Sequence, residues 1–136
     1  MRNVPSGTKG THTFVVADPH LANASNPSDP LLLPVLASKE MIVAMEFAAM
    51  NAMHPFLDAG ETSAGIGFNI MHLAATPPGH RVRTEAELVK QEGKKLEFKV
   101  RAFDENDEIG SGTHTRGVID KAKFNERVKS KIKAGS

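Results

Sequence analysis

Residues 41–56 contain the most restrictive feature of the sequence, a predicted helix with almost no polar side. Ser38, Lys39 and Glu40 supply a typical helix start, and no Pro or Gly follows before Pro55. Apolar side chains would fall on nearly every side of this helix: Ile42, Val43, Ala44, Met45, Phe47, Ala48, Ala49, Met50, Ala52 and Met53. A helix that is apolar all round has to be covered by protein. The remaining chain must therefore supply a surface that wraps around it.

The rest of the chain is dominated by alternation with a period of two residues, which predicts β-strands. Such runs occupy residues 12–17, 64–70, 82–88, 96–102 and 108–119. The connections, such as Glu92-Gly93-Lys94, are too short for the crossover that parallel strands need, so the sheet is predicted to be antiparallel. These features together predict an α+β domain in which one antiparallel sheet curls around a central buried helix.

Length and composition narrow the possible classes of protein. The 136 residues fit one domain, 1–136. The 17 Lys and Arg nearly balance the 16 Asp and Glu, so the net charge is close to zero. A chain with so little net charge has no strong electrostatic field to attract nucleic acid or an anionic membrane. The absence of Cys excludes disulfides and thiolate chemistry and is compatible with the cytosol. No apolar run is long enough to span a membrane, and residues 1–10 do not resemble a signal peptide. We therefore expect a soluble cytoplasmic protein, with a solvated basic helix at 121–133.

Glu46 is the polar exception in the predicted helix. Its neighbours one turn away are Ile42, Val43, Ala49 and Met50, none of them a cation. A carboxylate among apolar side chains must pair across the fold, bind a ligand or take up a proton. Glu46 is therefore a candidate site residue, and the alternative is a structural carboxylate paired with an Arg of the sheet.

Two residues of the predicted strand 64–72 are further candidates. His72 continues the parity of Ala64, Ile66, Phe68 and Ile70, so it is predicted to point inward unless a bulge intervenes. It would be either a core histidine or a catalyst that works with Glu46. Gly65 alternates with the apolar face and would allow close approach of a ligand or of the buried helix.

Ser38 and Arg116 each have two interpretations. Ser38 stands where an N-cap is expected, and a hydroxyl there would also suit a site. Arg116 shares the parity of His114 and Val118 in the last strand, from which it could pair with Glu46 or with an anionic ligand.

The segment 18–34 is predicted to be a loop, because it contains four prolines among Asn, Ser and Asp residues. Its apolar end, Leu31, Leu32 and Leu33, should touch something apolar. One interpretation is a lid or site wall, in which Leu32 and Leu33 would contact substrate. The other is a plug that covers an edge of the core.

Metal and nucleotide sites are not indicated. The six His residues show no His-x-His or His-x-x-x-His spacing, and Cys is absent. The Gly65-Ile66-Gly67 run lacks a third glycine and lies within a predicted strand, unlike a dinucleotide-binding loop. We therefore expect no metal and no nucleotide cofactor.

Four stretches carry a resemblance to a known family. They are residues 33–49 (LPVLASKEMIVAMEFAA), 60–66 (GETSAGI), 71–79 (MHLAATPPG) and 110–116 (GSGTHTR). The chain resembles hotdog-fold acyl-CoA thioesterases from about Thr11 to Phe124, and among them the fluoroacetyl-CoA thioesterases. The resemblance implies a hotdog fold, a homodimer or higher oligomer, and hydrolysis of an acyl-CoA without a cofactor beyond the coenzyme A of the substrate. A hotdog enoyl-thioester hydratase and a non-catalytic acyl-CoA-binding domain are the alternatives.

The resemblance also implies a set of site residues: Ser38, Glu46, Gly65, His72 and Arg116. Glu46 and His72 would activate water, or Glu46 would attack directly, while Ser38 would position the thioester or polarise a water. A backbone N–H near Gly65 would hold the oxyanion, and Arg116 would hold Glu46 ionised or anchor the ligand. The family's fluoroacetyl enzyme carries an aromatic lid before the helix, whereas residues 26–34 contain no Phe. An acyl group larger than acetyl is therefore predicted.

Overall fold

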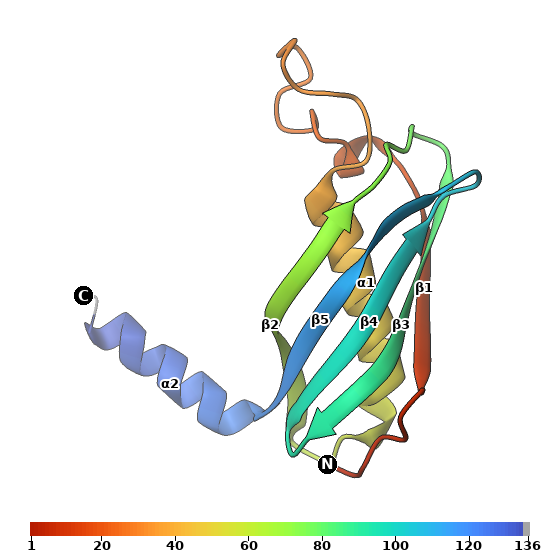
Figure 1. Ribbon diagram of the computed structural model, residues 1–136. Coiled ribbons are helices and arrows are strands. Elements are labelled where there is room, and N and C mark those ends of the chain that lie inside the picture. The colour runs from red at the N-terminus through yellow and green to blue at the C-terminus, as the bar shows by residue number, and fades with distance from the viewer. Residues whose placement is uncertain (135–136) are drawn as a thin grey trace.

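The computed structural model describes residues 1–134 and contains a curled five-stranded sheet packed on a central helix (Figure 1). The strands are β1 (Lys9–Val15), β2 (Glu61–His72), β3 (Arg81–Glu92), β4 (Lys95–Phe103) and β5 (Glu108–Asp120). The helices are α1 (Ser38–Met53) and α2 (Lys121–Ala134), with short 3-10 turns at Asp18–His20 and His54–Phe56. The predicted α+β architecture is confirmed.

The sheet has the strand order β1-β3-β4-β5-β2, and every neighbouring pair is antiparallel. Only Gly93 and Lys94 separate β3 from β4, and Gly93 has a φ of 61°, which suits glycine in a tight hairpin turn. Within residues 1–134, β2 pairs only with β5, so its other side is a free edge of twelve residues. The position of β2 matters because it carries Gly65 and His72.

The core lies between α1 and the concave face of the sheet. Met41, Met45 and Met53 of α1 are fully buried, as are Leu96, Phe98 and Val100 of β4. The prediction that α1 is enclosed on all sides is wrong for a single chain, because Val43 and Phe47 remain 40% and 42% exposed. The physical reason is that one curled sheet covers one side of a helix, so the opposite side of α1 needs another cover.

A bulge in β2 changes which side chains face the helix. Gly65 pairs with Arg116 and Gly67 with Thr115, so one extra residue, Ile66, is inserted between them. A Cβ on Gly65 would meet Glu46 of α1, whereas Ile66 packs over Gly117 on the opposite face of the sheet. The prediction that Ala64, Ile66, Phe68 and Ile70 share one face is therefore wrong for Ala64 and Ile66. The inserted residue shifts the alternation by one position, and such a shift reverses the face of the side chains on one side of the bulge relative to the other.

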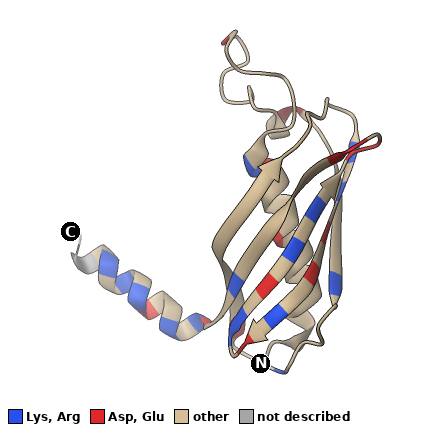
Figure 2. Cartoon of the chain, in the orientation of Figure 1, with Lys and Arg blue, Asp and Glu red and all other residues tan. Residues whose placement is uncertain are grey.

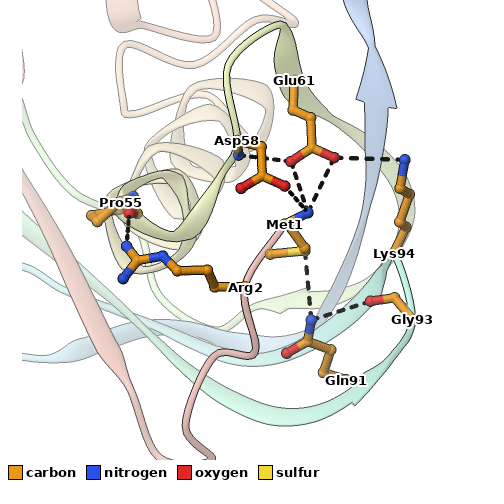
Figure 3. Close-up of polar contacts among 8 residues, drawn as sticks. All are labelled: Met1, Arg2, Pro55, Asp58, Glu61, Gln91, Gly93 and Lys94. Carbon is orange, nitrogen blue, oxygen red and sulfur yellow. Dashed lines mark hydrogen bonds and ion pairs between the residues drawn. The ribbon is translucent and has the colours of Figure 1, made fainter.

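The N-terminal segment closes the end of the domain where β2 begins (Figure 3). The amino group of Met1 lies 2.8 Å from Asp58 Oδ2 and 3.0 Å from Glu61 Oε1. Hydrogen bonds to Asp58 and Glu61 raise the pKa of this amino group. Arg2 donates to the carbonyl of Pro55 at 2.6 Å. These contacts hold the turn that leads from α1 into β2.

Charged residues are frequent along β3, β4 and α2, whereas β2 carries few of them (Figure 2). Of the helices that are described, none combines the length and the apolarity required to cross a bilayer.

We predict that Gly10 sets the distance between β1 and α1. A Cβ at this position would collide with the backbone of Ala48 and Ala52, and backbone atoms within a helix cannot easily give way. Gly10→Ala should therefore lower the free energy of unfolding by about 1 to 3 kcal/mol, measured by chemical denaturation. Gly117→Ala is the control, because its Cβ would lie 3.6 Å from Ile66, an ordinary contact. Equal stability of the two variants would contradict the prediction.

Candidate active site

One polar pair joins the start of α1 to the end of β2. The hydroxyl oxygen of Ser38 lies 2.7 Å from Nδ1 of His72. Ser38 is the first helical residue, Ala37 occupies the N-cap position, and no side chain caps this helix end. The interpretation of Ser38 as an N-cap is therefore wrong, because its hydroxyl contacts His72 and does not cap the helix.

The second nitrogen of His72, Nε2, is buried, and none of the residues 1–134 forms a hydrogen bond with it. Buried polar atoms are usually satisfied, so an orphan imidazole nitrogen in a site is available to a ligand. His72 also faces the helix as predicted, because its neighbour across the sheet is Gly110, where a Cβ would contact Met41 and Met45 of α1.

The second polar group forms around Arg116 of β5, whose side chain reaches Glu46 in the middle of α1. Arg116 is only 1% exposed, and its Nη1 donates to Glu46 Oε2 at 3.0 Å. Nε donates to the hydroxyl of Ser63 at 2.9 Å, and Nη2 donates to the Ser63 carbonyl at 3.1 Å. Burial lowers the pKa of Arg116 below its ordinary value, and the hydrogen bond and charge of Glu46 offset only part of this shift. The guanidinium stays charged because its pKa starts far above neutrality.

His114 completes the surroundings of Arg116. Its Nε2 lies 3.2 Å from Arg116 Nη1, and its Nδ1 lies 2.9 Å from the carbonyl oxygen of Gly67. Since the guanidinium can only donate and the carbonyl can only accept, Nε2 carries the lone pair and Nδ1 the proton. Burial, together with the charge of Arg116, lowers the pKa of His114. His114 therefore serves as a neutral acceptor for Arg116.

Gly65 provides room for the carboxylate. A Cβ at this position would lie 2.7 Å from Glu46 Oε2 and 2.9 Å from the ring of Phe68. The side chain of Glu46 is 24% exposed, so the carboxylate that Arg116 holds remains accessible beside the free edge strand. The prediction that Gly65 allows close approach is confirmed for Glu46, although the bulge places Gly65 on the helix side of the sheet.

Three residues of this network were not among the predicted site residues: Ser63, His54 and His114. The hydroxyl of Ser63 lies 2.8 Å from His54 Nε2, which extends the network to the end of α1. Burial, followed by the nearby charge of Arg116, lowers the pKa of His54. His114 shares the parity of Arg116, and this signal could have identified it. The sequence contains no comparable signal for Ser63 or His54.

The predicted site residues thus fall into two groups within one chain. Ser38 and His72 form the first group, and Glu46, Gly65 and Arg116 form the second. Ser38 and Glu46 are separated by about 12 Å along the helix axis, at about 1.5 Å per residue. The hydrogen bonds of the described residues include none that links Glu46 to His72. One chain does not bring the two groups into contact.

The leucine segment lies beyond the same end of the sheet as the Ser38–His72 pair, in the loop that projects in Figure 1. Leu31 and Leu33 are 86% and 62% exposed, and Leu32 is half-buried. The plug interpretation is therefore wrong for Leu31 and Leu33, because they do not cover the core of this chain. Among residues 1–134, no three His, Asp or Glu side chains gather as possible metal ligands.

Comparison with known proteins identifies the family. The family model described as fluoroacetyl-CoA-specific thioesterase matches residues 16–122. The fluoroacetyl-CoA thioesterase of Streptantibioticus cattleyicolor is 43% identical over 132 residues, which cover 95% of each protein. A solved structure of a fluoroacetyl-CoA thioesterase superposes with a TM-score of 0.89 at 41% identity, covering 96% of this chain and 98% of that one.

A more distant relative supports the same assignment. A thioesterase superfamily member from Thermus thermophilus superposes with a TM-score of 0.87 at 32% identity, covering 98% of this chain and 99% of that one. Both the sequence and the fold therefore lead to one conclusion. The chain belongs to the fluoroacetyl-CoA-specific thioesterase family and has the hotdog fold of the thioesterase superfamily.

Proposed function

We propose that this protein hydrolyses acyl-CoA thioesters with acyl groups larger than acetyl, in a site that two chains build together. Hydrolysis of an acyl-CoA thioester, and not hydration or binding alone, is the activity that family membership supports. The observation that carries the site is the accessible Glu46 carboxylate, held by a buried arginine beside the free edge of β2. The proposal includes a cytoplasmic location and no metal or redox cofactor.

Hydrolysis needs a nucleophile and a place for the developing oxyanion. In one route, Glu46 accepts a proton from water, the water oxygen adds to the thioester carbonyl, and the C–S bond breaks; the leaving coenzyme A thiolate takes up the proton from Glu46. In the other route, the Glu46 carboxylate adds to the carbonyl and the C–S bond breaks, which releases the coenzyme A thiolate and leaves an anhydride. Water then opens the anhydride to give the free acid and the Glu46 carboxylate, and the proton from this water goes to the thiolate. Arg116 serves both routes, because its charge-assisted hydrogen bond fixes the position of the carboxylate.

His72 and Ser38 are proposed to act on the other side of the thioester. The Ser38 hydroxyl fixes the imidazole ring through Nδ1, and Nε2, which makes no hydrogen bond to residues 1–134, is the nitrogen proposed to act on bound substrate. A backbone N–H near Gly65 is proposed for the oxyanion. Since β2 is an edge strand, backbone groups along one of its sides have no partner within the sheet.

The shared site is proposed because one chain leaves two surfaces incomplete. The free edge of β2 is twelve residues long and carries exposed Ile66, Phe68 and Met71. Long apolar edges invite pairing with another strand. α1 also lacks a cover over Val43 and Phe47. A two-fold dimer that pairs the two β2 edges would bring Glu46 of one chain toward the Ser38–His72 pair of its partner.

The first prediction concerns the two acid–base residues. Glu46→Gln and His72→Ala should each lower kcat for acyl-CoA hydrolysis by about 100-fold or more, because each removes a proton-transfer group. Release of free coenzyme A thiol, followed with a thiol-reactive dye, measures the activity. Glu40→Gln and His12→Ala are matched controls and should retain activity. Full activity in folded Glu46→Gln or His72→Ala protein would falsify the proposed roles.

The second prediction tests the shared site by mixing inactive variants. If Glu46 acts with the partner's Ser38 and His72, a mixed dimer of Glu46→Gln and His72→Ala contains one site with both lesions and one intact site. Random co-refolding makes half of the dimers mixed, so about one quarter of wild-type activity should return.

A second mixture provides the control for this experiment. Ser38 and His72 contact each other within one chain. Mixing Ser38→Ala with His72→Ala should therefore restore nothing, because each site still carries one lesion. Absence of recovery from verified mixed dimers of Glu46→Gln and His72→Ala would show that each chain works alone.

The third prediction concerns the acyl group. The exposed Leu31 and Leu33 offer an aliphatic surface near the Ser38 end of α1, and residues 26–34 contain no aromatic side chain. Each well-fitted methylene should favour a larger acyl group by about 1 to 3 kcal/mol. The value of kcat/KM should therefore rise from acetyl-CoA to short branched or longer acyl-CoAs. A higher kcat/KM for fluoroacetyl-CoA than for every larger acyl-CoA would overturn this preference.

A further inference from the structure

Helix α2 presents an apolar stripe that the described part of its own chain leaves uncovered. Phe124, Val128 and Ile132 follow one another at intervals of four residues, so they share one side of the helix. They are 39%, 43% and 67% exposed, and every residue from Lys121 to Ile132 is exposed. Figure 1 shows α2 extending away from the sheet on the side of β2. A stripe of large apolar residues on a projecting helix indicates a contact surface.

The direction of α2 is fixed where it leaves the sheet. β5 ends at Asp120 and α2 begins at Lys121, with no linker between them. The Asp120 carboxylate accepts from the backbone N–H of Lys123 at 3.0 Å and caps the helix. The N–H of Lys121 donates to the carbonyl of Gly60 at 2.9 Å, which ties the junction to the start of β2. These contacts hold the first turn of α2, and from there the helix extends away from the sheet (Figure 1).

Charge favours a second copy of the chain as the partner. Residues 121–134 contain six of the 17 basic residues and one of the 16 acidic residues, so α2 carries +5 and the remainder of the chain −4 (Figure 2). The body of a second copy is thus a surface of opposite net charge. Opposite charges steer two surfaces together and favour one partner over others.

We propose that the stripe of Phe124, Val128 and Ile132 docks on the body of a second copy of this chain and clasps the dimer. This inference rests on the proposed dimer formed through β2. Because α2 projects beyond the β2 side of the sheet, a copy paired on that edge would lie beside α2. The two helices of a two-fold dimer would each reach across to the other chain. The clasp adds an apolar contact outside the paired strand edges.

The experiment compares two variants that add the same charge to opposite sides of α2. Val128→Asp places a carboxylate in the stripe, and Ser130→Asp places one about half a turn away from it. Sedimentation analysis over a dilution series measures the dimer Kd. We expect Val128→Asp to raise the Kd at least tenfold, on the order of the loss of one buried apolar side chain. Ser130→Asp should leave the Kd within about twofold of the wild type.

A labelling experiment provides an independent readout, because the chain contains no Cys. A single Cys introduced as Val128→Cys should react slowly with a thiol reagent at concentrations where the protein is dimeric, and faster after dilution. Ser130→Cys should react at the same rate under both conditions. Protection at 128 that disappears on dilution supports the clasp without relying on a destabilising substitution.

The outcomes separate the clasp from the proposed shared site. A wild-type dimer whose Kd is unchanged by Val128→Asp overturns the clasp and leaves the shared site standing. An active protein that remains monomeric at all concentrations overturns both. Binding of wild-type protein to anionic phospholipid vesicles, lost in Val128→Asp while the dimer Kd stays constant, would overturn the clasp in favour of a membrane contact.

Discussion

The buried guanidinium of Arg116 is the constraint on which the arrangement of the site depends. A charged group removed from water must find an opposite charge and hydrogen-bond acceptors, since an unpaired buried charge is strongly destabilising. Glu46 supplies the charge from α1, Ser63 supplies two acceptors from β2, and His114 supplies a nitrogen from Arg116's own strand. One side chain thereby connects the helix to two strands and fixes their relative positions.

The same constraint explains the local sequence around the site. Gly65 has no side chain because Glu46 must reach Arg116 through the space that a Cβ would fill. The bulge at Ile66 allows this glycine to face α1 while Phe68 stacks on His114, with ring centres 4.5 Å apart. The carboxylate is then held beside the free edge of β2. A group with a fixed position and a partly open face suits catalysis better than a mobile surface carboxylate.

Periodicity was sufficient to predict the elements and the antiparallel sheet. A carboxylate in apolar surroundings singled out Glu46, and strand parity made Arg116 a possible partner, which the structure shows it to be. Other features depend on contacts between distant parts of the chain. Ser38 carries the local pattern of a helix cap, but its hydroxyl contacts His72, 34 residues away. The bulge at Ile66 reversed the predicted face of Ala64, because one inserted residue leaves the alternation of hydrophobicity nearly unchanged. Ser63 has no apolar pattern around it that would reveal its role.

A double-mutant cycle of stability tests the central claim, that the Glu46–Arg116 pair joins the helix to the sheet. Glu46→Leu leaves a buried, unpaired guanidinium and should cost about 3 to 5 kcal/mol. Adding Arg116→Met removes that charge, so the double variant should be more stable than Glu46→Leu alone. The predicted coupling energy, from chemical denaturation, is at least about 1.5 kcal/mol. If the two single losses simply add to give the loss of the double variant, the pair does not organise the structure and the account is wrong.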